Sequence, residues 1–117
     1  MRISPENWGP AYWKTFHVAC LAAANRDELH QFIEGYKLVV PCGACRIHFS
    51  QLLAENPLPT EEYFNWSVDI HNLVNASLGK RQFSYTEALD ELQKEPQQFN
   101  FKFIGIIVIL LIVISFL

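Results

Sequence analysis

The sequence has few cysteines, no run of basic residues and no internal repeat. Three cysteines among 117 residues are too few for a small fold built on a disulfide framework. The net charge of −3 and the absence of a basic stripe argue against a nucleic-acid-binding surface, so we expect no nucleic-acid partner. The segment from Met1 to Trp8 lacks the charged and then apolar pattern of a secretory signal, and we therefore expect the main domain to fold in the cytosol.

Segments with the alternating pattern of long β-strands are scarce as well, whereas apolar residues recur at helical spacing along the chain. The start at Ser4-Pro5-Glu6 combines an N-cap serine, a proline at the first helical position and an acid in the first turn. Short connections between amphipathic helices predict an all-α fold, namely an antiparallel four-helix bundle with a short fifth helix. The predicted helices run from Pro5 to about Asn25, Asp27 to Val40, the cysteine pair to about Glu55, Thr60 to about Gly79, and Ser84 to about Lys94.

The chain ends in an apolar run from Phe103 to Leu117. A membrane span takes about 20 apolar residues, a length that the run approaches only when it is counted back to Phe99. We predict a C-terminal transmembrane helix over 99–117, behind a folded domain over 1–98. The basic residue Lys102 is on the domain side of the run, which favours a cytoplasmic domain. The alternative is a terminal helix buried in an oligomer.

Two of the cysteines, Cys42 and Cys45, are separated by two residues at the predicted start of a helix. This spacing lets the two sulfurs meet within one helical turn, and a helix N-terminus stabilises a thiolate. Three interpretations remain open at this point. The pair is a redox-active dithiol, a pair of inert core thiols, or part of a zinc site that also uses His48 and the distant His71.

The third cysteine, Cys20, shares one stripe of the first predicted helix with Trp8, Tyr12 and Phe16. This pattern indicates a buried thiol. A disulfide that bridges two copies of the chain is the alternative.

The fourth predicted helix carries His71, Asn72 and Asn75 near its middle, although asparagine is a poor helix former. If this face is exposed, the three residues are neutral surface positions. If it lines a cavity, they offer the mixed donors and acceptors that a purine, ribose or flavin edge needs. Lys80 and Arg81, which follow the helix, are either solvated or close to a pyrophosphate.

The first predicted helix has a similar ambiguity at Gly9, Trp13 and His17, which are spaced one helical turn apart. The glycine leaves room for close approach, and the two rings could stack on a planar group. The same spacing is also typical of an aromatic stripe in the core.

These residues, in this order and spacing, resemble the signature of the Erv/ALR family of flavin-linked sulfhydryl oxidases. The resemblance covers the chain from about Trp8 to Phe83. The cysteine pair followed by His48 is most similar to the short members encoded by large DNA viruses. The matching motifs are Gly9-x3-Trp13-x3-His17, Cys42-x2-Cys45 and His71-Asn72-x-Val74-Asn75-x2-Leu78-Gly79-Lys80.

The resemblance implies a helical bundle that binds FAD and forms a homodimer. It implies that Cys42 exchanges with incoming dithiols and that Cys45 is next to the flavin. The implied cofactor-binding residues are Gly9, Trp13, His17, Cys45, His71, Asn72, Asn75 and Lys80.

The activity that the resemblance implies is that of an FAD-dependent thiol oxidase, with no metal in the site. The cysteine pair would take electrons from a thiol-bearing protein, or from a separate dithiol carrier, and pass them through FAD to O2. The products would be disulfides and hydrogen peroxide. With the predicted tail, the enzyme would be anchored in a membrane with its catalytic domain facing the cytoplasm, in the host cytoplasm or the virion membrane if the protein is viral. The alternative is a zinc-stabilised, membrane-tethered interaction module.

The sequence departs from the family pattern in three respects. Cellular members often carry a structural disulfide at the positions of Val68 and Tyr85, which cannot form here. A further pair that shuttles electrons is absent, and no tryptophan follows Trp66. We therefore expect stability to come from packing, FAD and dimerisation.

Overall fold

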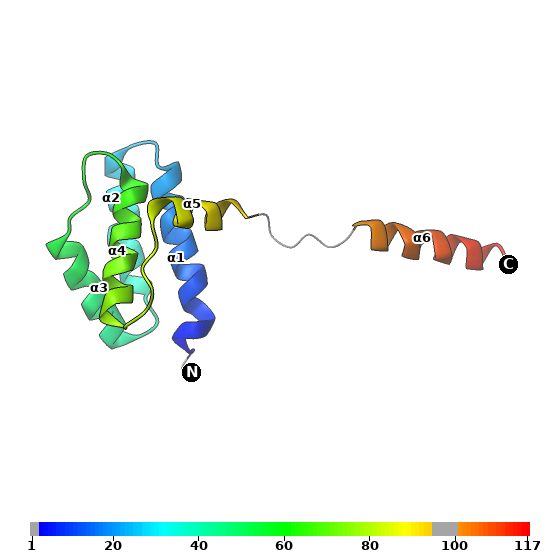
Figure 1. Cartoon of the computed structure of the whole chain (residues 1–117), viewed down its shortest axis with the longest axis horizontal. Coiled ribbons are helices and arrows are strands. Elements are labelled where there is room, and N and C mark those ends of the chain that lie inside the picture. The colour runs from blue at the N-terminus through cyan, green and yellow to red at the C-terminus, as the bar shows by residue number, and fades with distance from the viewer. Residues whose placement is uncertain (1–2, 95–100) are drawn as a thin grey trace.

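The computed structural model describes residues 3–94 and 101–117, and within them the chain contains helices and no strand. Four helices form a bundle, and a short fifth helix follows them (Figure 1). The predicted all-α class and the predicted four-helix bundle with a fifth helix are confirmed. The elements are α1 (Pro5–Ala22), α2 (Arg26–Tyr36), the 3-10 helix η1 (Lys37–Val39), α3 (Gly43–Glu55), α4 (Tyr63–Ser77), α5 (Tyr85–Gln93) and α6 (Phe101–Ser115).

Local capping explains where several of the helices begin. Pro5 follows an extended Ser4 at the start of α1. The side chain of Asn25 accepts the N–H of Glu28 at 2.8 Å and so caps α2. Because Asn25 caps α2, it is not part of α1, which ends at Ala22 and not at the predicted Asn25.

The segment before the cysteine pair also differs from the prediction. The predicted second helix continues to Val40, but the observed α2 tightens into η1 after Tyr36. Val40 is then extended, as expected for a residue that precedes proline. This change of direction turns the chain into α3.

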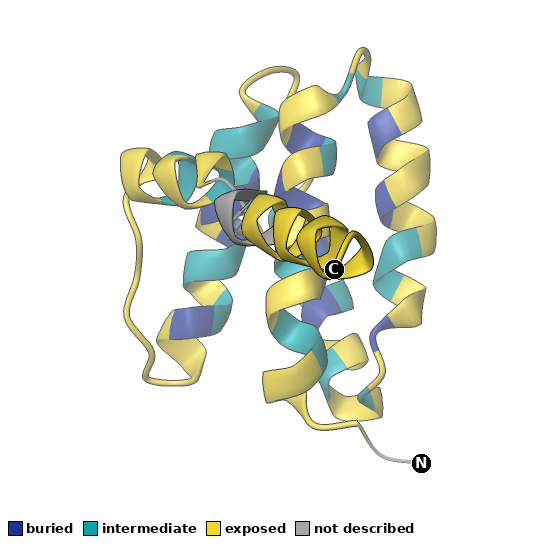
Figure 2. Cartoon of the chain, turned by 90° about the vertical axis from the view of Figure 1, so that its right-hand side faces the viewer, coloured by how far each residue is buried: buried dark blue, intermediate teal, exposed yellow. Residues whose placement is uncertain are grey.

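The core is centred on Phe16 of α1, whose side chain is completely buried. Its ring lies 5.8 Å from Phe49 of α3 and 5.7 Å from Trp66 of α4, measured between ring centroids. Figure 2 shows the buried positions on the faces that the helices turn toward one another. The buried apolar residues are Phe16, Cys20, Leu29, Ile33, Val40, Phe49, Leu53, Leu58, Val68 and Ile70.

A reciprocal tyrosine pair joins α1 to α2. The hydroxyl of Tyr12 donates to the carbonyl of Tyr36 at 2.9 Å, and the hydroxyl of Tyr36 donates to the carbonyl of Tyr12 at 2.9 Å. The two rings stack with their centroids 4.2 Å apart. Burial raises the pKa of both phenols, so the pair remains neutral and can hold both hydrogen bonds.

Both ends of α4 have a left-handed residue. Glu62 (φ 56°) precedes the helix, which therefore begins at Tyr63 and not at the predicted Thr60. Gly79 (φ 67°) follows it, with its N–H donating to Ala76 and the N–H of Lys80 donating to Asn75. This hydrogen-bond pattern is a Schellman motif, and it determines where Lys80 leaves the helix.

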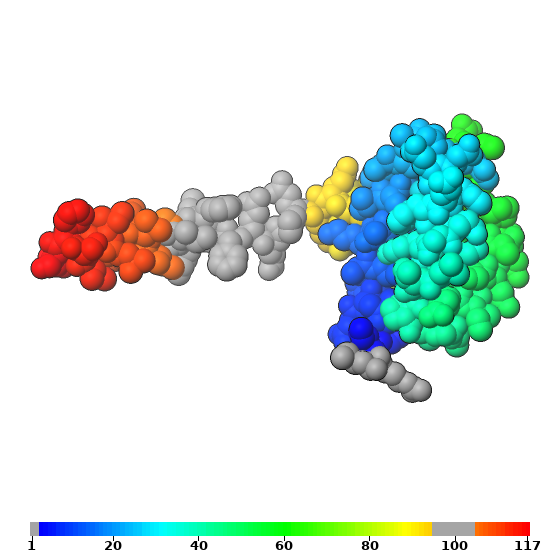
Figure 3. Space-filling view, turned by 180° about the vertical axis from the view of Figure 1, so that it is seen from behind, coloured from blue at the N-terminus to red at the C-terminus, as the bar shows by residue number. Residues whose placement is uncertain are grey.

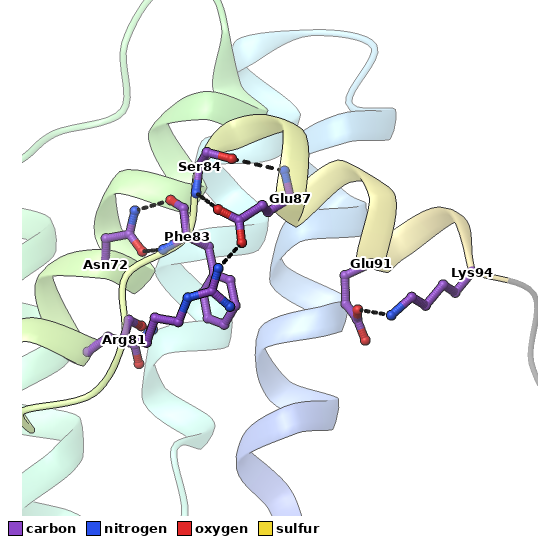
Figure 4. Close-up of polar contacts among 8 residues, drawn as sticks. Asn72, Arg81, Phe83, Ser84, Glu87, Glu91 and Lys94 are labelled. Carbon is purple, nitrogen blue, oxygen red and sulfur yellow. Dashed lines mark hydrogen bonds and ion pairs between the residues drawn. The ribbon is translucent and has the colours of Figure 1, made fainter.

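The segment between α4 and α5 is held by side chains (Figure 4). Asn72 pairs with the backbone of Phe83 through two hydrogen bonds of 2.8 and 2.9 Å. Ser84 and Glu87 form a capping box at the start of α5, and Arg81 pairs with Glu87. In addition, the hydroxyl of Tyr85 donates to Asp69 at 2.8 Å, so hydrogen bonds join α5 to α4 without a disulfide.

The C-terminal helix α6 stands clear of the bundle (Figure 3). Every residue from Gly105 to Leu117 is exposed. In the described part of the chain, no helix combines the length and the apolar character that crossing a membrane requires. The transmembrane helix predicted over 99–117 is therefore not found in the part of it that the structure describes. The predicted domain boundary at residue 98 and the start of the predicted helix lie outside the described residues.

Candidate active site

Cys42 and Cys45 form a disulfide at the start of α3, with their Cα atoms 5.1 Å apart. Cys42 is the N-cap residue, and its Sγ accepts the N–H of Cys45 at 3.2 Å. Both cysteines are half-buried, and Cys45 packs against the core. The interpretation as a pair of inert thiols does not agree with this arrangement.

The position of Cys42 favours thiol exchange. A sulfur at a helix N-terminus is close to unpaired N–H groups and to the positive end of the helix dipole. Both stabilise a thiolate, which is the species that attacks or leaves in disulfide exchange. The N–H of Cys45 is already directed at Cys42 Sγ.

A second feature is the aromatic–imidazole surface, which consists of Trp13 and His17 of α1 and His71 of α4. The indole of Trp13 and the imidazole of His71 stack with centroids 4.0 Å apart and planes 8° apart. His17 lies beside both rings, at 5.9 Å from Trp13 and 5.2 Å from His71. The two motifs that were ambiguous in the sequence are therefore parts of one surface.

Hydrogen bonds connect the two imidazoles to the interior of α4. Nε2 of His17 is 3.0 Å from Nδ1 of His71, and Nδ1 of His17 is 2.8 Å from Oγ of Ser67. Burial lowers the pKa of His17 and of His71 to about 4, so both rings are neutral near pH 7. A neutral imidazole keeps one lone pair and can accept a hydrogen bond.

Phe49 connects the disulfide to the aromatic–imidazole surface. Cys45 and Phe49 are one turn apart on α3 and both belong to the packed core. The ring of Phe49 meets the indole of Trp13 edge-on, with centroids 5.8 Å apart. The sulfur pair and the stacked rings are therefore held by the same group of aromatic side chains.

Gly9 and Lys80 flank this surface. Gly9 is one turn before Trp13, and a Cβ at that position would have no heavy atom within 4 Å. The positive charge of Lys80 contributes to lowering the pKa of His71 and that of Glu6 on α1. The charge of Lys80 therefore acts both on Glu6, in the first turn of α1, and on His71.

The two predicted asparagines make contacts within the chain. The side-chain Nδ2 of Asn72 donates to the carbonyl of Phe83, and its Oδ1 accepts the N–H of Phe83. Nδ2 of Asn75, which is buried, donates to the carbonyl of Arg81 at 3.1 Å. They hold the segment that follows the Schellman motif, and their predicted contact with a cofactor remains a prediction.

Two residues of this region were missed by sequence reasoning. Ser67 precedes His71 by one turn of α4 and is completely buried. Phe49 follows Cys45 by one turn of α3. In both cases the available signal was the spacing of four residues from a residue that had already been singled out.

The alternative zinc site lacks a ligand set in the described structure. His48 is exposed, and the imidazole of His71 is stacked on Trp13. Within residues 3–94 and 101–117, no three His, Cys, Asp or Glu side chains are grouped so that they could hold a metal ion. Cys20 is a buried free thiol, as predicted, and burial raises its pKa to about 12.

Comparison with known proteins identifies related sequences. The profile of the Erv1 / Alr family matches residues 10–96. A probable FAD-linked sulfhydryl oxidase of Acanthamoeba polyphaga mimivirus is 35% identical over 104 residues, which cover 79% of this chain and 73% of that protein. An FAD-linked sulfhydryl oxidase of African swine fever virus is 31% identical over 90 residues, covering 69% of this chain and 76% of that protein. A yeast protein of the same description, from Saccharomyces cerevisiae, is 33% identical over 92 residues, covering 71% of this chain and 47% of its own length.

The neutral histidines predict a dependence of stability on pH. The pKa of His17 and of His71 is about 4 in the folded chain and close to 6.5 when unfolded, so the unfolded chain binds more protons between these values. The free energy of unfolding should therefore keep its full value above pH 6.5 and fall as the pH drops toward 4. The slope should approach about 1.4 kcal/mol per pH unit for His17 and be smaller for His71, which is partly open to water.

Urea denaturation at pH 6.5 and pH 5 measures this slope. His17→Gln should reduce the slope, because it removes one of the two buried imidazoles. Equal slopes in the original protein and in His17→Gln would contradict the assignment.

Proposed function

The chain belongs to the Erv1/Alr family, and from this premise we propose that it is an FAD-linked thiol oxidase that makes disulfides through Cys42 and Cys45. One observation carries the proposal. The disulfide caps a helix whose next turn, at Phe49, packs against Trp13 of the aromatic–imidazole surface. A thiol-exchange centre and a surface suited to a planar cofactor are therefore joined by direct packing.

The residues of this surface fit FAD. The stacked rings of Trp13 and His71 present a flat π surface, and Gly9 leaves free space one turn away. Lys80, whose positive charge acts on His71, supplies a cation suited to a pyrophosphate. When bound, FAD accepts an electron pair from thiols and returns it to O2, which the chain's own side chains cannot do.

Substrate thiols react at Cys42 in this proposal. A substrate thiolate attacks Cys42 Sγ, the Cys42–Cys45 bond breaks, and Cys45 leaves as a thiolate. A second substrate thiolate attacks the mixed disulfide, which releases the oxidised product and leaves Cys42 as a thiolate. Two substrate thiols thus lose two electrons and two protons, and transfer of these to O2 gives hydrogen peroxide. Cys45, on the core side, holds the electron pair closest to the cofactor.

The substrate is a protein dithiol or a separate dithiol carrier. The chain's remaining cysteine, Cys20, is buried and so cannot pass electrons to Cys42. Leu38 and Val39 before the pair and Ile47 after it are each about 60% exposed, with values of 61%, 60% and 63%. This apolar rim is suited to contact with a protein.

A homodimer is part of the same proposal. Val18 and Leu21 on α1 and Phe32 on α2 are exposed apolar side chains of two consecutive helices. Between these helices, at Ala19 and Phe32, lies a groove of about 310 Å³. Burying such side chains against a second copy would remove apolar surface from water.

We further propose that the C-terminal segment attaches the domain to a membrane, with the domain on the cytoplasmic side. The exposed apolar residues from Ile106 to Ile114 support attachment, because such a surface is unfavourable in water. The relatives from mimivirus and African swine fever virus support a viral protein. Its place of action in this proposal is the host cytoplasm or the virion membrane.

Replacement of either active cysteine tests the oxidase directly. The full-length protein should show flavin absorbance and consume oxygen with dithiothreitol. Cys42→Ser and Cys45→Ser should each keep the flavin band but lose at least about 100-fold in rate, because neither variant can form the disulfide.

The matched control for these variants is Cys20→Ala, which removes the third thiol and should retain oxygen consumption. A correctly folded protein that takes up no flavin and consumes no oxygen would sink the oxidase proposal.

Substitution at Gly9 tests the position of the cofactor. Gly9→Leu should not reduce the stability of the flavin-free protein, since a Cβ at this position meets no heavy atom within 4 Å and leucine favours helix. It should weaken FAD binding roughly tenfold or more, because overpacking typically costs about 1–3 kcal/mol. Gly35→Leu is the control, since Gly35 is also helical and open. Equal FAD affinity in the two variants, measured by titration of flavin fluorescence, would place the cofactor elsewhere.

Membrane attachment is tested by flotation with liposomes. The full chain should float with the vesicles, and a chain that lacks residues 101–117 should remain at the bottom of the gradient. Placing charges in α6 by the double change Ile109→Asp and Ile112→Asp keeps the length and should also abolish flotation. Flotation of the shortened chain would show that α6 is not the attachment site.

A further inference from the structure

A continuous chain of hydrogen bonds crosses the contact between α1 and α4. It begins at the carbonyl of Phe64, passes through Oγ of Ser67 and both nitrogens of His17, and ends at His71. Ser67 is completely buried and His17 is 7% exposed, so water cannot replace these partners. Each of these hydrogen bonds therefore needs one proton between its two heavy atoms.

The first proton in the chain belongs to the hydroxyl of Ser67. Oγ of Ser67 lies 2.7 Å from the carbonyl oxygen of Phe64, and a carbonyl can only accept. The hydroxyl must therefore donate to Phe64. If it donated to His17 instead, two acceptor oxygens would face each other at that distance without a proton.

The remaining protons follow from the first. Because the proton of Ser67 is already used, Nδ1 of His17 must donate to Oγ of Ser67 across 2.8 Å. Nε2 of neutral His17 is then bare, and it accepts the N–H at Nδ1 of His71 across 3.0 Å. His71 is in turn left with a bare Nε2.

The bare Nε2 of His71 is available to a ligand. It makes no hydrogen bond in the described structure, where every buried side-chain nitrogen and oxygen has a partner. Nε2 is therefore not fully buried, and its ring is stacked against Trp13.

We propose that Ser67 is a positioning residue that fixes His17 and His71 as Nδ1–H tautomers, so that His71 offers a hydrogen-bond acceptor to an N–H or O–H group of the bound cofactor. The groups in FAD that could donate are its ribose and ribityl hydroxyls, its adenine amino group and the flavin N–H. The ligand part of this inference rests on the proposed function. The proton assignment does not, since it needs only the residues described above.

The surroundings support neutral rings. Burial lowers the pKa of both histidines, and the positive charge of Lys80 lowers that of His71 further. The other titratable group near Ser67 is the thiol of Cys20, whose pKa is raised by burial and which is therefore uncharged. No carboxylate among these neighbours favours an imidazolium.

Nitrogen NMR of the imidazoles tests the proton assignment in the flavin-free, full-length protein in detergent at pH 7. Long-range 15N–1H correlations distinguish a protonated ring nitrogen from a bare one. Both His17 and His71 should carry the proton on Nδ1, although free histidine favours Nε2. Finding His71 with its proton on Nε2, or either ring as an imidazolium, would overturn the proposal whether or not the protein binds FAD.

Ser67→Ala tests the role of the hydroxyl. Without the acceptor for Nδ1–H, His17 should change to the Nε2–H tautomer or become mixed, and FAD should bind about three- to tenfold more weakly. Ser67→Thr, which keeps a hydroxyl, should retain the original tautomers.

The matched control is Ser77→Ala. Ser77 makes the same bond to the carbonyl three residues before it on α4, also at 2.7 Å, but is exposed and contacts no histidine. Its replacement should change neither the tautomers nor FAD affinity. Unchanged tautomers in Ser67→Ala, or an equal loss of affinity in Ser77→Ala, would contradict the positioning role.

Discussion

The packing of α1 on α4 is the contact on which the rest of the structure depends. It places Trp13 on His71 and His17 on Ser67, and it buries Phe16 against Trp66. Aromatic stacking and directed hydrogen bonds have strict geometry, so they determine how the two helices are rotated relative to each other. A loosely packed pair of helices could not maintain both the aromatic stacking and the hydrogen bonds.

The same packing connects the Cys42–Cys45 disulfide to the aromatic–imidazole surface. Phe49 of α3 touches Trp13 and Phe16, and one turn earlier α3 carries Cys45. The disulfide is therefore fixed with respect to the stacked rings by the core itself. In many small proteins such rigidity comes from additional disulfides, whereas here it comes from aromatic packing and from hydrogen bonds such as Tyr85 to Asp69.

Helical spacing was enough to predict the bundle and the short fifth helix, because amphipathic periodicity and caps are local properties. The motif resemblance singled out Trp13, His17 and His71, but not their mutual contact, which joins residues far apart in the sequence. Ser67 was missed because its one signal, a spacing of four residues from His71, does not show that its hydroxyl meets His17 of another helix. Asn72 and Asn75 were singled out as cofactor contacts, yet the structure also shows them holding the backbone of residues 81–83. The transmembrane helix that was predicted from the apolar run is not found in the described residues, and the start of that run lies outside them.

In the proposed reaction Cys45 passes electrons to FAD, and anaerobic reduction of the flavin tests this transfer. With oxygen removed, addition of dithiothreitol to the flavin-loaded protein should bleach the flavin absorbance rapidly. In Cys45→Ser the band should persist, because the serine hydroxyl cannot carry the electron pair. Rapid bleaching in Cys45→Ser would show that thiols reduce the flavin without the disulfide, and it would contradict the account.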